Sequence, residues 1–335
     1  MEGRKLQLAG KSTFLVSLPK RWVTNAGLKP GDTLFVDTES DGSVSIRLSS
    51  GARPTVRRKS FVERGEETRE HLIRKLIGAY IAGFGLVEVR FSPPRGPFVR
   101  RVAREFCRLV IGPEVIEETQ GSITIQDLSD PSELSSEKCL RRMHLTVRAM
   151  LEDAINALKT GNETLAHDVE LRSQDVNRLY WMVAKQYHLA HAGASDGANA
   201  PTVHGHRLIA KMLERIGDHA QRIAVAGSSV TADRSLDGRL RDELDEARGS
   251  AVGILDQAFQ ALVTRNIETA NAAIDARGEH QKLIDALAHR VAARRGPGLL
   301  PLGAVVDSLN RIAVYAGEIA EEAIDLAVYS NPEAT

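Results

Sequence analysis

Two carboxylates four residues apart are the first feature of this sequence that could do chemistry. Glu214 and Asp218 lie between Leu213 and Ala224, where apolar residues recur at intervals of three and four. That periodicity predicts a helix packed in a bundle, and the spacing puts both carboxylates one turn apart on one face, where they repel by about 0.2–0.5 kcal/mol. A hard divalent cation would relieve this repulsion. An ordinary solvated helix face is the alternative.

The helix that carries this pair belongs to a helical region that begins near residue 132. Six helices are predicted, at approximately 135–159, 163–191, 203–226, 236–264, 267–294 and 300–329. Their short connections are typical of an up-and-down bundle. Residues 213–224 also align with residues 309–320 at an offset of 96. We therefore expect residues 132–230 and 231–335 to form tandem three-helix bundles.

This duplication and the motif LERIGDHA at 213–220 resemble the PhoU family of phosphate-uptake regulators. The resemblance covers about residues 135–330. It implies multinuclear metal clusters held by Glu/Asp-x-x-x-Asp motifs, one in each repeat, and so assigns metal binding to Glu214 and Asp218. The metal is left open among iron, zinc, magnesium and manganese. The second repeat has Asn310 and Val314 at the matching positions, so we expect no cluster there and a partly apolar docking face instead.

The first 50 residues are predicted to form a small β-rich module. Short strands are expected near 5–8, 13–18, 34–36 and 44–46, with a helix at 20–26. So few residues cannot bury much surface alone, which suggests a second copy as partner. The stretches SLPKRW (17–22) and GLKPGDTL (27–34) resemble the AbrB/SpoVT family of swapped-hairpin domains. That resemblance implies a homodimer that binds DNA.

The charge of the N-terminal region also favours a polyanionic partner. Residues 1–59 carry 11 basic and 5 acidic groups, although the whole chain has 44 of each. Contact with DNA phosphates requires such an excess of positive charge. The candidate DNA-binding residues are Arg4, Lys5, Lys11, Lys20 and Arg21. Alternatively, these residues only solubilise a module whose role is to assemble the protein.

Residues 51–131 are predicted to contain a basic linker up to residue 59 and then a small α+β domain in the order βαβαββ. This region shows no residue pattern that could do chemistry. The expected fold is therefore multidomain. It comprises a β-rich swapped-hairpin domain at 1–50, this second segment at 51–131, and the all-α tandem bundles.

Four histidines flank the connection between the second and third helices of the first bundle. These are His188, His191, His204 and His206. Imidazoles that met at one end of the bundle would suit zinc. Solvated or capping histidines are the alternative.

The sequence does not indicate an enzyme or a membrane protein. It has no phosphate loop, dinucleotide glycine fingerprint or Ser/His/Asp order, and no histidine follows a glutamate by three residues, as a di-iron bundle requires. Cys107 and Cys139 have neither metal nor redox spacing. No apolar run reaches the roughly 18–20 residues of a membrane span, and the N-terminus lacks a signal-peptide core. We expect a cytoplasmic protein that is not integral to a membrane.

These observations together predict a DNA-binding regulator of phosphate uptake. The PhoU-like body would receive a signal, and the N-terminal dimer would bind DNA. The family implies phosphate-transporter components or a signalling kinase as partners. An adaptor that binds a transporter, with an N-terminal module that only dimerises it, is the alternative.

Overall fold

The computed structural model describes residues 3–10, 13–38, 44–47, 56–129, 133–191, 200–232 and 236–330. The chain divides into two compact units, Met1–Val56 and Arg57–Thr335.

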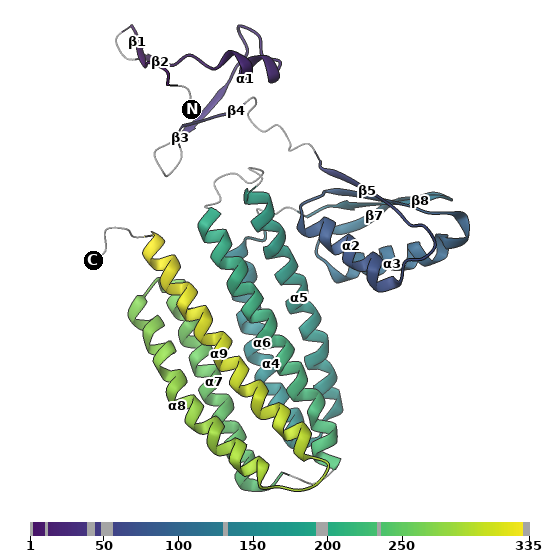
Figure 1. The fold of residues 1–335 in the computed structure, drawn as a ribbon, viewed down its shortest axis with the longest axis vertical. Helices are drawn as coiled ribbons and strands as arrows, with labels where there is room; N and C mark the ends of the chain where they lie inside the picture. Colours follow the sequence, from purple (N-terminus) through teal and green to yellow (C-terminus); the bar gives the residue numbers. More distant parts are fainter. Residues whose placement is uncertain are drawn as a thin grey trace. The chain divides into compact units, whose positions relative to one another are not determined.

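The first unit is a pair of hairpins with a short helix between them (Figure 1). β1 (Gln7–Ala9) pairs antiparallel with β2 (Thr13–Leu15), α1 spans Lys20–Asn25, and β3 (Phe35–Thr38) pairs antiparallel with β4 (Val44–Arg47). No residue of α1 is buried, and its Trp22 is only partly covered. Large apolar side chains are exposed throughout: Leu6, Leu8, Phe14, Leu15, Val16, Phe35, Val36 and Val44.

The second unit begins with an α+β domain. Its elements are β5 (Arg58–Val62), α2 (Arg69–Ile81), β6 (Leu86–Arg90), a 3-10 turn (Pro93–Arg95), α3 (Gly96–Leu109), β7 (Pro113–Glu118) and β8 (Ser122–Asp127). The sheet order is β5-β6-β8-β7, with β5 and β6 parallel and the other pairs antiparallel. Alternate strand residues face α2 and α3 and form a core of their own.

The predicted basic linker ends too late in the sequence. Arg58 and Lys59 are residues of β5 and pair with Leu86 and Val87 of β6. Their charge concealed the start of the first predicted strand because β5 lies at the sheet edge, where both side chains stay exposed.

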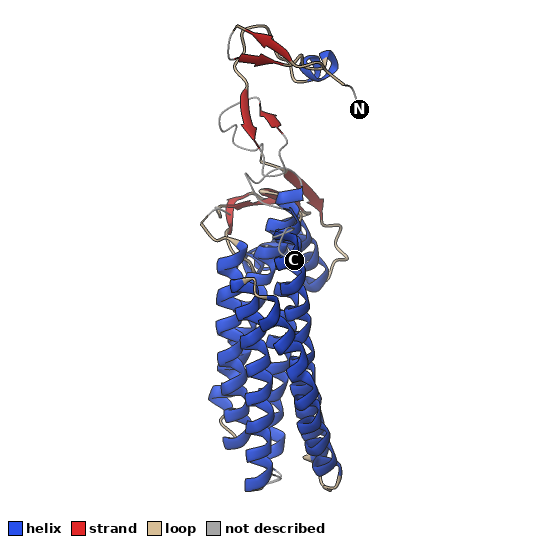
Figure 2. Ribbon diagram, turned by 90° about the vertical axis from the view of Figure 1, so that its left-hand side faces the viewer, coloured by secondary structure: helices blue, strands red, loops and turns tan. Residues whose placement is uncertain are grey.

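Long helices that lie side by side form the remainder of the described second unit (Figure 2). They are α4 (Ser136–Thr160), α5 (Glu163–His191), α6 (Ala200–Ala232), α7 (Gly238–Thr264), α8 (Ile267–Ala292) and α9 (Leu299–Ser330). Ser135, Asp237 and Asn266 begin α4, α7 and α8 by accepting hydrogen bonds from backbone N–H groups of the first turn. Such caps satisfy donors that the helix itself leaves free. The apolar positions that predicted these helices are buried, which confirms the helical prediction.

The helices form two three-helix bundles, α4-α5-α6 and α7-α8-α9, that share one continuous core. The bundles meet chiefly where α6 packs along α9. His219 and Tyr315 occupy matching positions of the two repeats, and their rings lie 5.9 Å apart across this contact. His219 Nδ1 also lies 3.2 Å from Ser308 Oγ of α9. The two halves of the duplication therefore face each other through equivalent surfaces.

The α+β domain is fixed to α5 by a buried ion pair. The Lys185 ammonium contacts the carboxylate of Asp127, and these side chains are only 5% and 8% exposed. Lys185 Nζ also donates to Ser129 Oγ at 2.8 Å and lies 4.9 Å from the ring centroid of Tyr80. Trp181 of α5 packs against the core of the α+β domain nearby.

Within the described residues, α9 alone is long and apolar enough to cross a membrane by length and composition. Its most apolar window is 44% buried, and α9 packs against α6, α7 and α8. A core helix of a bundle has these properties too. The cytoplasmic location stays a prediction.

Candidate functional site

The predicted metal pair lies on the middle of α6, on the side that borders α5. The side chains of Glu214 and Asp218 are 13% and 31% exposed. Both side chains are thus more covered than on the solvated helix face that was the alternative from the sequence. Because α6 packs against α4, α5 and α9, few of its described positions are exposed, and Arg215 is one of them.

Basic side chains surround this acidic pair. Lys211 Nζ donates to Glu214 Oε2 at 2.7 Å and lies 4.8 Å from the ring centroid of Tyr180 on α5. Arg215 lies 3.8 Å from the Glu214 carboxylate and 4.0 Å from that of Asp218. The sequence contained this signal, since Lys211 precedes Glu214 by three residues and so shares its helix face.

Burial raises the pKa of the Asp218 carboxyl, and the neighbouring Glu214 carboxylate raises it further, while Arg215 and Lys211 oppose the change. The ionised form of Asp218 is therefore less stable in the folded protein than it is in water. A bound cation would stabilise that ionised form.

The pair fits a weakly held cation better than a closed metal site. Carboxylate oxygens suit hard divalent metals. Among the residues that the structure describes, however, no group of three or more His, Cys, Asp or Glu side chains is placed to hold a metal. A cation at Glu214 and Asp218 would take its other ligands from water or from a second molecule, and it would displace Lys211. The assignment stays a prediction.

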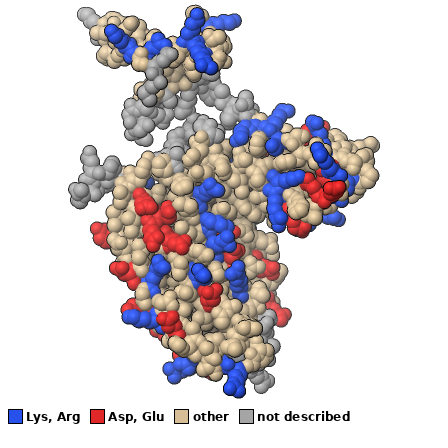
Figure 3. Space-filling model, in the orientation of Figure 1, with Lys and Arg blue, Asp and Glu red and all other residues tan. Residues whose placement is uncertain are grey.

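The matching face of the second repeat has a different character. Asn310 and Val314 are partly buried, Ile324 packs against the core, and Val328 is exposed. Figure 3 shows acidic side chains gathered over the helical body, and α9 supplies four in its C-terminal half: Glu318, Glu321, Glu322 and Asp325. Burial raises the pKa of Glu322, and Asp325 and Glu321 add to the shift. The predicted docking role of this face is untested.

Three of the four flanking histidines meet at one end of the first bundle. Tyr187 has His188, His191 and His204 around its ring, with centroids 5.3, 4.2 and 5.6 Å away. The Arg207 guanidinium lies 4.6 Å from the same ring centroid. His206 does not join this group, because it lies on another face of α6 and contacts Ser136 Oγ at 2.8 Å. The described groups include no metal-binding arrangement of these imidazoles.

The predicted DNA-binding residues that the structure describes lie on the surface of the first unit. Arg4 and Lys5 precede β1, and Lys20 and Arg21 begin α1; all four are exposed. Lys11 lies outside the described residues. Exposure is what a phosphate contact needs, and a purely solubilising role needs it too.

Comparison with known proteins connects the helical body to a family. Residues 140–226, which span most of α4 to α6, match the family model of the PhoU domain. The chain contains a PhoU domain. This domain carries both Glu214 and Asp218. No protein of curated function matches the chain in sequence.

Two solved structures share the PhoU fold with this chain. PhoU from Pseudomonas aeruginosa matches with a TM-score of 0.52 and 19% identity, over 58% of this chain and 96% of that one. The phosphate transport system regulatory protein PhoU from Streptococcus pneumoniae matches with a TM-score of 0.51 and 16% identity, over 60% and 95%. These likenesses confirm the fold of the tandem bundles. The family match does not extend to residues 1–50, and their AbrB/SpoVT resemblance stays a prediction.

Proposed function

We propose that this protein regulates phosphate uptake without being an enzyme. Its PhoU domain receives a signal, and its N-terminal module carries that signal to DNA. The observation that carries the first half of this proposal is the match of residues 140–226 to the PhoU domain. A structural relative bears the name of a phosphate transport system regulatory protein, which supports the same process here. Transporter components or a signalling kinase are the proposed partners of the body.

The second half of the proposal rests on the surface of the first unit. Four exposed basic residues, Arg4, Lys5, Lys20 and Arg21, stand beside an exposed set of large apolar side chains. Apolar area on this scale is typical of a surface that another chain covers. We therefore propose that two copies dimerise through the module and that the basic residues contact DNA phosphates.

The metal role belongs to this proposal as well. Glu214 and Asp218 would hold iron, zinc, magnesium or manganese, and the metal would act by replacing Lys211 beside Glu214. The raised pKa of Asp218 and its repulsion from Glu214 support a cation at this position.

Reversal of two charges tests the DNA-binding function. The sites bound by the full-length protein would first be mapped across the genome in high and low phosphate. Lys20→Glu with Arg21→Glu should then abolish the salt-dependent mobility shift of those fragments, because counterion release dominates such binding. The matched control is Arg239→Glu with Lys282→Glu, which changes the charge equally on exposed positions of α7 and α8. This control should bind normally.

The same variants decide between regulator and adaptor. The adaptor hypothesis is favoured by the PhoU match as much as the regulator is, since that match concerns only the body. If Lys20→Glu with Arg21→Glu leaves phosphate-responsive transcription intact, the N-terminal module only assembles the protein. If it abolishes both binding and regulation while the dimer persists, the module is the DNA-binding part.

A further inference from the structure

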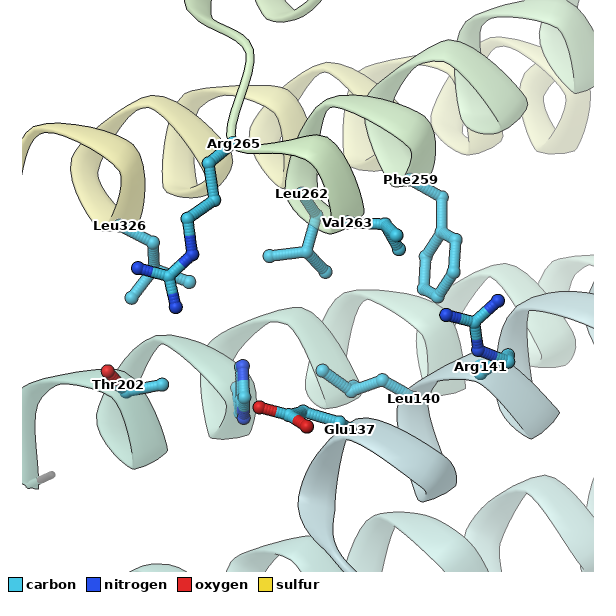
Figure 4. Close-up of a pocket in the computed structure, with 10 residues that line it drawn as sticks. Glu137, Leu140, Arg141, Thr202, Phe259, Leu262, Val263, Arg265 and Leu326 are labelled. Atoms are coloured by element: carbon cyan, nitrogen blue, oxygen red, sulfur yellow. The ribbon is translucent and has the colours of Figure 1, made fainter. Parts of the chain in front are cut away.

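A pocket of about 230 Å³ lies where the ends of four helices from both bundles meet (Figure 4). Its walls come from the first turns of α4 and α6 and from the last turns of α7 and α9. It is about as large as seven or eight waters at about 30 Å³ each. A ligand there would contact both halves of the duplication at once.

The pocket combines apolar walls with a cationic rim. Leu140, Phe259 and Leu326 supply buried apolar surface. Figure 4 shows Arg141 from α4 and Arg265 from the end of α7 reaching into the space between the helices. Glu137 is the one acidic residue of the lining, so two guanidinium groups against one carboxylate leave a net positive charge.

Arg141 and Arg265 form no ion pair with the residues that the structure describes, although α6, α7 and α8 use their arginines in many ion pairs. His206 is buried in the wall, and its Nδ1 contacts Ser136 Oγ at 2.8 Å. Burial lowers the pKa of His206, so its imidazole is neutral at pH 7 and adds no charge.

Backbone strain supplies an independent observation at the same place. Arg265 ends α7 with φ 52° and ψ 40°, and it is the one non-glycine residue with positive φ in the described chain. Glycine is the usual residue at such a helix end, and another residue there costs roughly 1–2 kcal/mol. The chain thus tolerates a strained arginine where glycine would fit, and it aims the guanidinium into the pocket. Strain of this kind is concentrated at functional positions.

We propose that this pocket binds a small organic anion, an anionic head group on a compact apolar body. The guanidinium groups of Arg141 and Arg265 hold the head group, and Leu140, Phe259 and Leu326 cover the apolar body. Because the ligand bridges α4 and α6 to α7 and α9, its binding strengthens the contact between the two bundles. This site is separate from Glu214 and Asp218 and does not depend on DNA binding.

Phenyl phosphate is a suitable probe, and Arg265→Gly is the informative variant. Glycine fits the backbone at 265, so the variant removes the guanidinium while the thermal midpoint of the ligand-free chain stays equal or rises. Calorimetry on the full-length protein should show one phenyl phosphate site per chain. The affinity should fall at least tenfold in Arg265→Gly and in Arg141→Gln. Arg142→Gln, at the neighbouring exposed position outside the pocket, should bind as the unaltered protein does.

Several results would overturn the proposal. Absence of phenyl phosphate binding at millimolar concentration would do so, as would equal affinity in Arg265→Gly. If phenol bound as tightly as phenyl phosphate, the anionic head group would contribute nothing to binding. Inorganic phosphate bound as tightly as phenyl phosphate would show that the apolar walls play no part.

Discussion

Removal of Lys185 from the junction between α5 and the α+β domain should destabilise that junction by about 3 kcal/mol. Lys185→Met keeps the length of the side chain but leaves the buried Asp127 carboxylate without its cation. Loss of one partner from a buried ion pair costs about 3–5 kcal/mol. The lower end applies here because the Ser129 N–H and hydroxyl still donate to Asp127 Oδ1, at 3.0 and 2.6 Å. The other oxygen, Oδ2, is the atom that loses its partner.

A double-mutant cycle isolates the ion pair. Asp127→Asn alone should cost a similar amount, since it strands the Lys185 ammonium. Asp127→Asn with Lys185→Met should lie within about 1 kcal/mol of the unaltered protein, because replacement of a whole buried pair is often nearly neutral. The amide oxygen that Asp127→Asn introduces would still accept hydrogen bonds from Ser129.

The measurement can use fluorescence at the junction itself. The chain has two tryptophans, and a Trp22→Phe background leaves Trp181, which packs against the α+β core, as the sole reporter. Urea titrations followed by Trp181 would give the free energy of unfolding for each variant. A cost below about 1 kcal/mol for Lys185→Met, or a double variant as unstable as the single ones, would refute the argument.

Three further outcomes are expected. Gly227→Ala should destabilise α6 by about 1–3 kcal/mol, because a Cβ there would lie 3.0 Å from Leu158 Cα of the α4 backbone. Gly253→Ala should instead stabilise α7 by about 0.5–1 kcal/mol, because a Cβ there would have no neighbouring atom within 4 Å. Urea midpoints of the two variants that failed to move in opposite directions would contradict this expectation. Stability should fall as the pH drops below about 6.5, because the unfolded chain then binds protons that the folded chain does not. Burial is the chief cause of the lowered pKa values of the histidines responsible, which are His144, His206, His219 and His280. A urea midpoint that did not change between about pH 7.5 and 5.5 would show that these histidines do not contribute to the pH dependence of stability. Titration of the full chain with Zn²⁺, Fe²⁺, Mg²⁺ and Mn²⁺ should give no more than one metal site per chain. The double variant Glu214→Gln with Asp218→Asn should lose this site. More than one cluster per chain, or metal binding that the double variant leaves unchanged, would contradict the proposed site.

The fold of the helical body could be predicted from the sequence because the apolar pattern of each helix is local and the pattern of three helices is repeated. Apolar residues at intervals of three and four placed five of the six helices within two residues of their observed ends. The exception is α6, predicted at 203–226, which spans Ala200–Ala232. The duplication at an offset of 96 residues then indicated how the six helices are grouped. The first strand of the βαβαββ order was expected only after residue 59, although β5 begins at Arg58. Its start was misplaced because Arg58 and Lys59 carry exposed charge, which conceals the period-two pattern of a strand.

The surroundings of the candidate site could not be predicted as well from the sequence, since they depend on contacts between segments that are distant in the chain. Spacing put Glu214 and Asp218 on one face correctly, but their exposure depends on how closely α5 approaches α6. The pocket lined by Arg141 and Arg265 brings together residues 124 positions apart. No pattern in the sequence predicts that these two residues line the same pocket.

The packing of α6 on α9 has a consequence for how the two bundles assemble. Because His219 and Tyr315 hold matching positions and face each other, this contact has the geometry of an isologous interface, in which the same patch meets its own copy. Both patches belong to one chain, so their pairing is intramolecular and does not depend on protein concentration. The two patches need not be identical in sequence, and the repeats do differ, with Glu214 and Asp218 in one and Asn310 and Val314 in the other.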